Sequence, residues 1–138
     1  MAIGHLFSGI NWLAVIVASV AAFGLGGLWY SKALFGNRWM QEVGLSEQAL
    51  ANTNMKPVFA GAFLLQFIAA TTLAKFLGTD ANWLVGLHAG LLIGFCWVAT
   101  AYGITYLFEQ RSLRLFMINA GYFVVLFAMA GTIIGAWP

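Results

Sequence analysis

The charged residues of this 138-residue chain are so few, and so placed, that they leave four long segments without any charge. The uncharged segments are residues 1–31, 57–74, 81–108 and 115–138. An α-helix needs about 20 predominantly apolar residues to cross a hydrocarbon core about 30 Å thick. Each segment therefore has room for one crossing of a membrane, and none has room for two.

The composition agrees with lipid as the main solvent, because 62% of the residues are hydrophobic and only 7% are charged. A soluble domain carries about 25% charged residues. The segments are continuously apolar, unlike the alternating strands of a membrane barrel, and a helix satisfies its own backbone in lipid. We predict an all-α, integral membrane, four-helix up-down bundle. It forms one domain over residues 1–138, with helices near 11–30, 57–77, 84–108 and 115–137.

The basic residues predict the orientation of this bundle in the membrane. Five of the six fall in the first and third connections, which share one side: Lys32, Arg38, Lys56, Arg111 and Arg114. Short loops rich in Lys and Arg stay in the cytoplasm. We therefore predict a multi-pass protein of the bacterial inner (plasma) membrane, with both termini outside the cytoplasm.

The first connection is long enough to hold helices of its own. Residues 34–43 combine apolar and polar side chains, as in a short helix lying in the membrane interface. Gly44 would end that helix, and Ser46 is a good N-cap for a second one. This interfacial helical segment is either a connector that rests among the headgroups or a docking surface for a partner.

Small residues recur every four positions along the third and fourth predicted helices, at Gly86, Gly90, Gly94, Gly131 and Gly135. Such residues let helix backbones approach closely in lipid. The pattern fits packing within one chain and packing between copies in a homo-oligomer equally well. Helical periodicity places Ala101 and Thr105 on the same face as the glycines of the third helix. It places His88, Tyr102 and Tyr106 roughly opposite that face.

Several short motifs follow one another along nearly the whole chain. They are Asn11-Trp12, Gly27-Leu28-Trp29-Tyr30-Ser31, Phe35-Gly36, Trp39-Met40, Gly44-Leu45-Ser46-Glu47, Leu107-Phe108-Glu109, Arg111-Ser112-Leu113, Ile118-Asn119-Ala120-Gly121-Tyr122, and then Met129, Gly131, Ile133, Gly135 and Trp137. In order and spacing the chain resembles the small bacterial membrane proteins catalogued as domain of unknown function 1761. It departs from them at Lys32, where family members often have Pro. The resemblance implies four membrane helices and no particular activity.

The polar and interfacial aromatic side chains give the candidate functional positions, which are Asn11, Trp29, Tyr30, Ser31, His88, Tyr102, Glu109, Arg111, Asn119 and Tyr122. Asn11 and Asn119 fall near opposite ends of their helices, so they belong to different places. Glu109 with Arg111 and Arg114 forms the densest charged cluster. It is either a gate or lipid-headgroup site, or an ion-paired cluster that fixes the loop to Arg38 or Lys32.

Several kinds of chemistry find no support in the sequence. His88 is expected to hydrogen-bond a neighbouring helix, because a metal site needs more ligands than His5 and Asp80 would add. Haem ligation by His5 and His88 lacks an attachment motif. No acidic residue lies within a span to carry protons, and no catalytic signature or nucleic-acid surface is present. We therefore expect no catalytic residues, no metal, no cofactor and no nucleic-acid partner.

Three functions remain open at this point. The first is a non-enzymatic bundle that acts through oligomerisation, as an accessory subunit, or by binding membrane lipids. The second is a small-solute channel or transporter with a path between the third and fourth helices, past His88, Tyr102 and Asn119. The third is a membrane enzyme acting on a lipid or quinone, with Trp29, Tyr30, Glu109 and Arg111 at its mouth.

Overall fold

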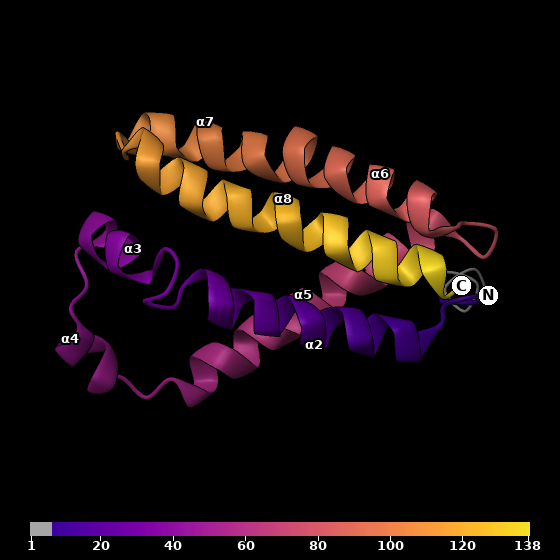
Figure 1. The fold of residues 1–138 in the computed structure, drawn as a ribbon, viewed down its shortest axis with the longest axis horizontal. Coiled ribbons are helices and arrows are strands. Elements are labelled where there is room, and N and C mark those ends of the chain that lie inside the picture. Colours follow the sequence, from indigo (N-terminus) through magenta and orange to yellow (C-terminus); the bar gives the residue numbers. More distant parts are fainter. Residues whose placement is uncertain (1–6) are drawn as a thin grey trace.

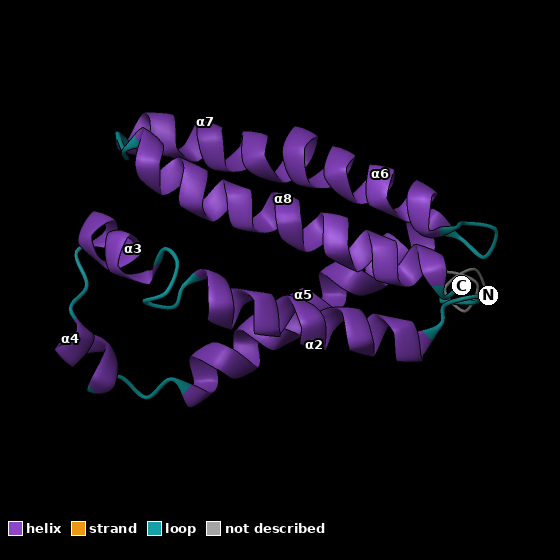
Figure 2. Cartoon of the chain, viewed as in Figure 1, coloured by secondary structure: helices purple, strands orange, loops and turns teal. Residues whose placement is uncertain are grey.

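A computed structural model describes residues 7–138 of the chain, and helices are the regular secondary structure of these residues (Figure 2). The helices are α2 (Trp12–Trp29), α3 (Gly36–Val43), α4 (Glu47–Ala51), α5 (Lys56–Leu77), α6 (Trp83–Ile93), the π-helix η1 (Gly94–Ala99), α7 (Thr100–Glu109) and α8 (Leu113–Ala136).

Four of these elements are long and apolar enough to cross a membrane: α2, α5, the continuous run of α6, η1 and α7, and α8. They alternate in direction along the chain, and the C-terminus lies at the end where α2 begins (Figure 1). The predicted all-α, four-helix up-down bundle is confirmed, and each helix begins and ends within two residues of its prediction. This is the architecture of a multi-pass membrane protein. We call the opposite end, where α3 and α4 lie, the α3 end.

α8 is the helix around which the others are arranged. It lies between α2 and the run of α6, η1 and α7 (Figure 1), and it carries the largest share of buried residues among the four spans. The shared core joins α2 and α5 to α8 through buried apolar side chains, among them Val15, Ala18, Ala22, Leu73, Leu126 and Ala130. α8 therefore contacts each of the other three spans.

The glycines of α6 and η1 lie directly against α8 of the same chain. A Cβ atom on Gly86 would overlap the carbonyl oxygen of Gly131, and one on Gly90 would overlap the carbonyl oxygen of Phe127. A Cβ atom on Gly94 would lie only 2.8 Å from the Cα atom of Val124. Only glycine permits so close an approach. In this structure these glycine faces serve packing within one chain.

The π-helix η1 changes which residues of the third span face α8. In an uninterrupted α-helix, the residues seven and eleven positions after Gly94 return to its face, which is why Ala101 and Thr105 were expected there. That expectation was wrong, because both are exposed, while Tyr102 and Tyr106 are half-buried against α8. A π-turn holds one more residue than an α-turn, so it advances the packing face by one position.

The first connection contains two short helices, as predicted. α3 ends at Gly44, whose φ of 77° is the left-handed conformation that glycine adopts at little cost. Ser46 caps α4 by accepting a hydrogen bond from the backbone N–H of Ala49 at 3.0 Å. Lys32, at the start of the connection, pairs with Glu47 at 2.5 Å. These contacts hold the connection as an ordered cover over the α3 end.

Candidate functional site

The side chain of Asn119 joins three of the four spans near the α3 end. Its Oδ1 accepts a hydrogen bond from the hydroxyl of Tyr30, which follows α2, at 2.7 Å. Its Nδ2 donates to the hydroxyl oxygen of Tyr106 on α7, also at 2.7 Å. Both groups of the amide are thereby used inside the bundle. Asn119 is a polar hub in the part of the structure that is otherwise built from apolar side chains.

Two further hydrogen bonds fasten the end of α2 to α8. The indole Nε1 of Trp29 donates to the carbonyl oxygen of Ile118 at 2.9 Å. In the reverse direction, the hydroxyl of Tyr122 donates to the carbonyl oxygen of Ala22 at 3.1 Å. Each carbonyl oxygen has two lone pairs, so it can accept this bond and keep its backbone hydrogen bond within the helix. They fix the position of Tyr30 relative to Asn119.

Four tyrosines surround Asn119, and we call Tyr30, Tyr102, Tyr106 and Tyr122 the tyrosine cluster. The rings of Tyr30 and Tyr122 meet edge to face with centroids 5.3 Å apart, and those of Tyr102 and Tyr106 do so at 5.5 Å. Tyr102 also stacks on Phe123 at 5.5 Å. Offset and edge-to-face contacts are the favourable arrangements of aromatic rings. The cluster is therefore a well-packed aromatic surface, and each of its members remains partly accessible.

The hydrogen-bond capacity of the cluster is not used up inside the protein. A tyrosine hydroxyl has one proton to donate as well as lone pairs to accept with. Tyr106 accepts from Asn119, so its own proton points elsewhere, and it meets no acceptor among the described residues. The hydroxyl of Tyr102 has no hydrogen-bond partner within residues 7–138 either. Two neighbouring hydroxyl groups thus remain available as donors.

The hydroxyl of Tyr30 is the first donor in the hydrogen-bonded chain through Asn119. Tyr30 lies one residue beyond the α2 span, and burial, followed by the neighbouring tyrosines, raises the pKa of its hydroxyl above the usual value near 10. Its proton therefore stays in place at physiological pH. Successive hydrogen bonds polarise one another, so the chain from Tyr30 through Asn119 strengthens Tyr106 as a donor.

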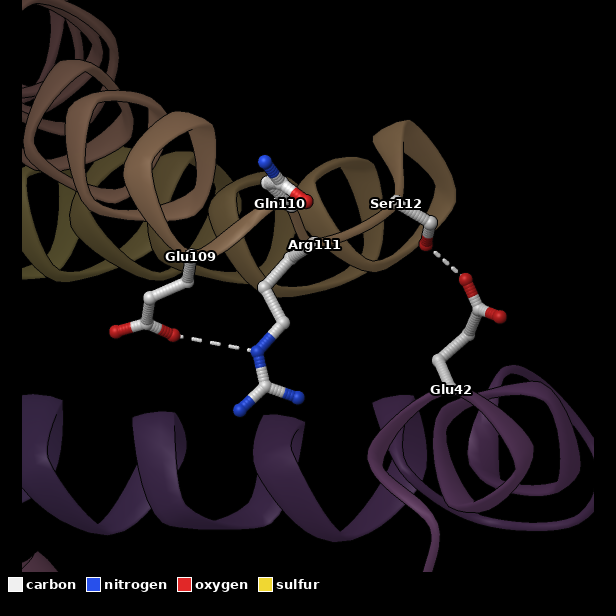
Figure 3. A pocket seen from close by; sticks show the side chains of 5 residues that line it. All are labelled: Glu42, Glu109, Gln110, Arg111 and Ser112. Carbon is white, nitrogen blue, oxygen red and sulfur yellow. Dashed lines mark hydrogen bonds and ion pairs between the residues drawn. The ribbon is translucent and has the colours of Figure 1, made fainter.

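A charged pocket opens at the turn between α7 and α8 (Figure 3). We call it the mouth pocket. Its volume is about 670 Å³, and it is lined by Glu42, Glu109, Gln110, Arg111 and Ser112. Helix α3 connects it to the cluster, because Glu42 lines the pocket and Trp39, three residues earlier, meets the ring of Tyr30 edge to face with centroids 5.6 Å apart.

The ion pairs of the mouth pocket differ from those expected. One of the two alternatives for the Glu109 cluster was an ion pair that fixes the loop to Arg38 or Lys32. Instead, Oε1 of Glu109 lies 3.2 Å from Nε of Arg111, and Lys32 pairs with Glu47. The side chain of Glu42 reaches from α3 and accepts a hydrogen bond from the hydroxyl of Ser112 (Figure 3). This last contact joins the interfacial helix to the start of α8.

The remaining candidate residues lie elsewhere or serve the local backbone. Asn11 caps α2 and donates to the carbonyl oxygen of Trp137 at 3.0 Å, at the opposite end from Asn119. The hydroxyl of Ser31 donates to the carbonyl oxygen of Leu28 at 2.7 Å. His5 lies outside the described residues. Neither Asn11 nor Ser31 therefore contributes to the tyrosine cluster.

The position of His88 differs from the expectation in two respects. Its Nδ1 lies 2.8 Å from the carbonyl oxygen of Leu84 in its own helix, so it does not bond a neighbouring helix. It is exposed, and η1 separates its face from that of Tyr102. The structure therefore places His88 on a different face from Tyr102, which with Asn119 was expected to line the same path. Among the described residues, no group of three or more His, Cys, Asp or Glu side chains is placed to hold a metal ion.

Among the residues of the site that the sequence analysis did not single out are Glu42, Gln110, Tyr106, Ser112 and Trp39, whose ring meets that of Tyr30. Tyr106 carried a signal in its spacing of four residues from Tyr102, but the π-turn concealed which way both residues face. Ser112 stands just before the fourth apolar segment, as an N-cap does, and it caps α8 by accepting from the N–H of Leu115 at 3.0 Å. Glu42 gave no local signal, because its contact is with Ser112, far away in the chain. Trp39 meets Tyr30 only because α3 folds back toward the end of α2.

The family comparison covers most of this architecture. Residues 13–135 match the family described as Protein of unknown function (DUF1761). The chain belongs to this family. No curated protein and no solved structure matches it. The matched range includes all members of the tyrosine cluster, Asn119 and the mouth pocket, so the site lies within the region that defines this DUF1761 chain.

Proposed function

We propose that this chain is a non-enzymatic membrane protein that binds a membrane lipid at the tyrosine cluster. The observation that carries the proposal is the pair of unused donors on Tyr102 and Tyr106. A hydroxyl group in an apolar environment costs free energy unless it is hydrogen-bonded. Both donors belong to half-buried rings, and we propose that a membrane lipid reaches their accessible side.

The chemistry of the cluster defines what such a ligand presents. Donor groups ask for an acceptor, which the ester and phosphate oxygens of a lipid supply. The rings of Tyr102 and Phe123 offer an apolar surface for the chain that follows. Tyrosine suits this position because its ring is apolar and its tip is polar, as at membrane interfaces generally. The site therefore fits the boundary between a lipid's headgroup and its acyl chains.

The use of the glycine faces favours lipid binding over self-association. Gly86, Gly90 and Gly131 form the close contact between α6 and α8 of one chain. These glycines are therefore not available to pack against a second copy of the chain. A homo-oligomer, or a role as accessory subunit of a larger complex, would then need other surfaces.

The distribution of charge gives the proposed position in the membrane. The α3 end carries Lys32, Arg38, Lys56, Arg111 and Arg114. We place this end in the cytoplasmic headgroup layer of the bacterial inner membrane and both termini on the opposite side. The tyrosine cluster then binds a lipid of the cytoplasmic leaflet.

Native mass spectrometry of the protein released from gentle detergent tests the proposal. We expect lipid retained at a defined ratio to protein, and reduced at least about ten-fold in Asn119→Leu, because a loss of about 1.4 kcal/mol gives that factor. Gln66→Leu is the matched control, since it also replaces a side-chain amide with leucine, but on α5, away from the cluster. Equal retention by the two variants, or none by the wild type, would overturn the proposal.

A further inference from the structure

The mouth pocket contains side chains of both charges next to the proposed lipid site. Glu42 projects from α3, while Glu109 and Arg111 project from the α7–α8 turn toward the side of α2 and α3 (Figure 3). Two carboxylates and one guanidinium give this lining a formal charge of −1 at neutral pH. The rest of the α3 end is basic, and none of its other basic residues lines the pocket. The pocket thus differs locally from the surface around it.

The guanidinium of Arg111 is only partly engaged. Its Nε contacts Oε1 of Glu109 at 3.2 Å, and its two terminal nitrogens meet no acceptor among residues 7–138 (Figure 3). Arg binds phosphate through the fork of these nitrogens. Each of the two glutamates also uses only one carboxylate oxygen, Glu42 toward Ser112 and Glu109 toward Arg111. The pocket therefore retains both donor and acceptor capacity.

A ligand that satisfies these groups has an anionic phosphate for Arg111 and a hydrogen-bonding cation for the two glutamates. It also has an apolar body for the adjoining tyrosine cluster. A phospholipid with a primary ammonium group combines all three features. A lipid with a glycerol headgroup lacks the cation and brings a net negative charge toward two carboxylates. A choline headgroup is cationic, but its nitrogen has no N–H to donate to a carboxylate.

We infer that the bound lipid is an aminophospholipid, held by Glu42 and Glu109 at its ammonium group and by Arg111 at its phosphate. This inference rests on the proposed lipid site at the tyrosine cluster and adds the headgroup class to it. The geometry that supports the connection is helix α3, which carries Glu42 into the mouth pocket and, three residues earlier, Trp39 against Tyr30 of the tyrosine cluster, with ring centroids 5.6 Å apart.

The test offers the protein three lipids at once. The chain is reconstituted in vesicles of equal parts phosphatidylethanolamine, phosphatidylglycerol and phosphatidylcholine with identical acyl chains, and retained lipid is read by native mass spectrometry. We expect phosphatidylethanolamine to exceed each competitor at least about five-fold. Glu109→Gln and Arg111→Gln should each lower this preference below about two-fold. Glu47→Gln, at the same end but outside the mouth pocket, should leave it unchanged.

Reversing the charge at Glu109 should also reverse the headgroup preference. Glu109→Lys changes the formal charge of the lining from −1 to about +1, and we expect it to shift the preference toward phosphatidylglycerol. Retention of lipid by the wild type without headgroup preference, or with preference for phosphatidylglycerol, would overturn the headgroup inference and leave the proposed function standing. No retention of any of the three lipids would overturn the proposed function itself.

Discussion

The hydroxyl oxygen of Tyr106 lies 2.7 Å from Nδ2 of Asn119 because a single π-turn, earlier in the same span as Tyr106, rotates Tyr106 toward α8. Without the additional residue in η1, Thr105 would occupy that face. The hydroxyl of Thr100 supports the turn by donating toward the carbonyl oxygens of Cys96 and Trp97, at 2.7 and 2.9 Å. π-turns recur at functional sites in helices, and here the turn assembles the tyrosine cluster.

Asn119→Leu should lower the free energy of unfolding as well as lipid retention. The change removes two hydrogen bonds and leaves the hydroxyls of Tyr30 and Tyr106 without their partner. Side-chain hydrogen bonds in membrane proteins average about 0.6 kcal/mol and reach about 1.7, so we expect a loss of about 1–2 kcal/mol. Unfolding in mixed micelles with increasing denaturing detergent measures it. An unchanged midpoint would show that Asn119 is not a structural hub.

Deleting Cys96 should preserve the packing of α7 on α8. The deletion removes the additional residue of η1, so a regular α-helix would bring Tyr102 and Tyr106 to the same face without a π-turn. Deleting Thr105 is the matched control, since it lies after η1 and would rotate Tyr106 away from Asn119. We expect the free energy of unfolding to fall much more for the second deletion. Equal losses would contradict the proposed origin of the register.

Gly90→Ala and Gly61→Ala should have opposite effects on stability. A methyl group on Gly90 would overlap the carbonyl oxygen of Phe127, whereas no atom lies within 4 Å of the position it would take on Gly61. Overpacking costs about 1–3 kcal/mol or more, while alanine is favoured over glycine within a helix by about 1 kcal/mol. Denaturation of both variants in parallel measures the difference. A neutral Gly90→Ala would contradict the close approach of α6 and α8.

The orientation can be tested by cysteine labelling in intact spheroplasts, after Cys96, the chain's sole cysteine, is replaced. Pro138→Cys should react with a membrane-impermeant thiol reagent, because the C-terminus is placed outside the cytoplasm. Gln48→Cys, exposed on α4, should react only after lysis. The reverse pattern would place the α3 end outside and remove the cytoplasmic leaflet as the source of the lipid.

The four spans were predictable because their signal is local and strong, consisting of uncharged segments between clustered charges. Gly44 and Ser46 were predictable for a similar reason, since helix ends depend on the residues beside them. The faces of the third span were not. One extra residue in η1 rotates every later residue of the span to a different face. No residue within Gly94–Ala99 indicates from its type that a π-turn forms there. Tyr102 and Tyr106 were therefore assigned to the face opposite the one they occupy.

Contacts between distant segments could not be predicted from the sequence either. Asn119, Tyr30 and Tyr122 were each singled out as polar or interfacial aromatic positions. Their spacing of three residues makes Asn119 and Tyr122 neighbours on one helix, but nothing indicated that Tyr30 meets them. Their meeting depends on the packing of α2 on α8, which is set by buried residues such as Ala18 and Leu126. The pairing of Glu42 with Ser112 depends in the same way on where α3 folds back.

Tyr102→Phe tests the central claim most directly, because it removes one hydroxyl that has no hydrogen-bond partner among the described residues and leaves the stacked ring in place. The measurement is lipid retention by native mass spectrometry, with the free energy of unfolding determined on the same preparation without added lipid. If the cluster binds a lipid through this hydroxyl, retention falls at least about five-fold while the stability of the lipid-free protein is unchanged. Undiminished retention of lipid by a stably folded Tyr102→Phe variant would contradict the account.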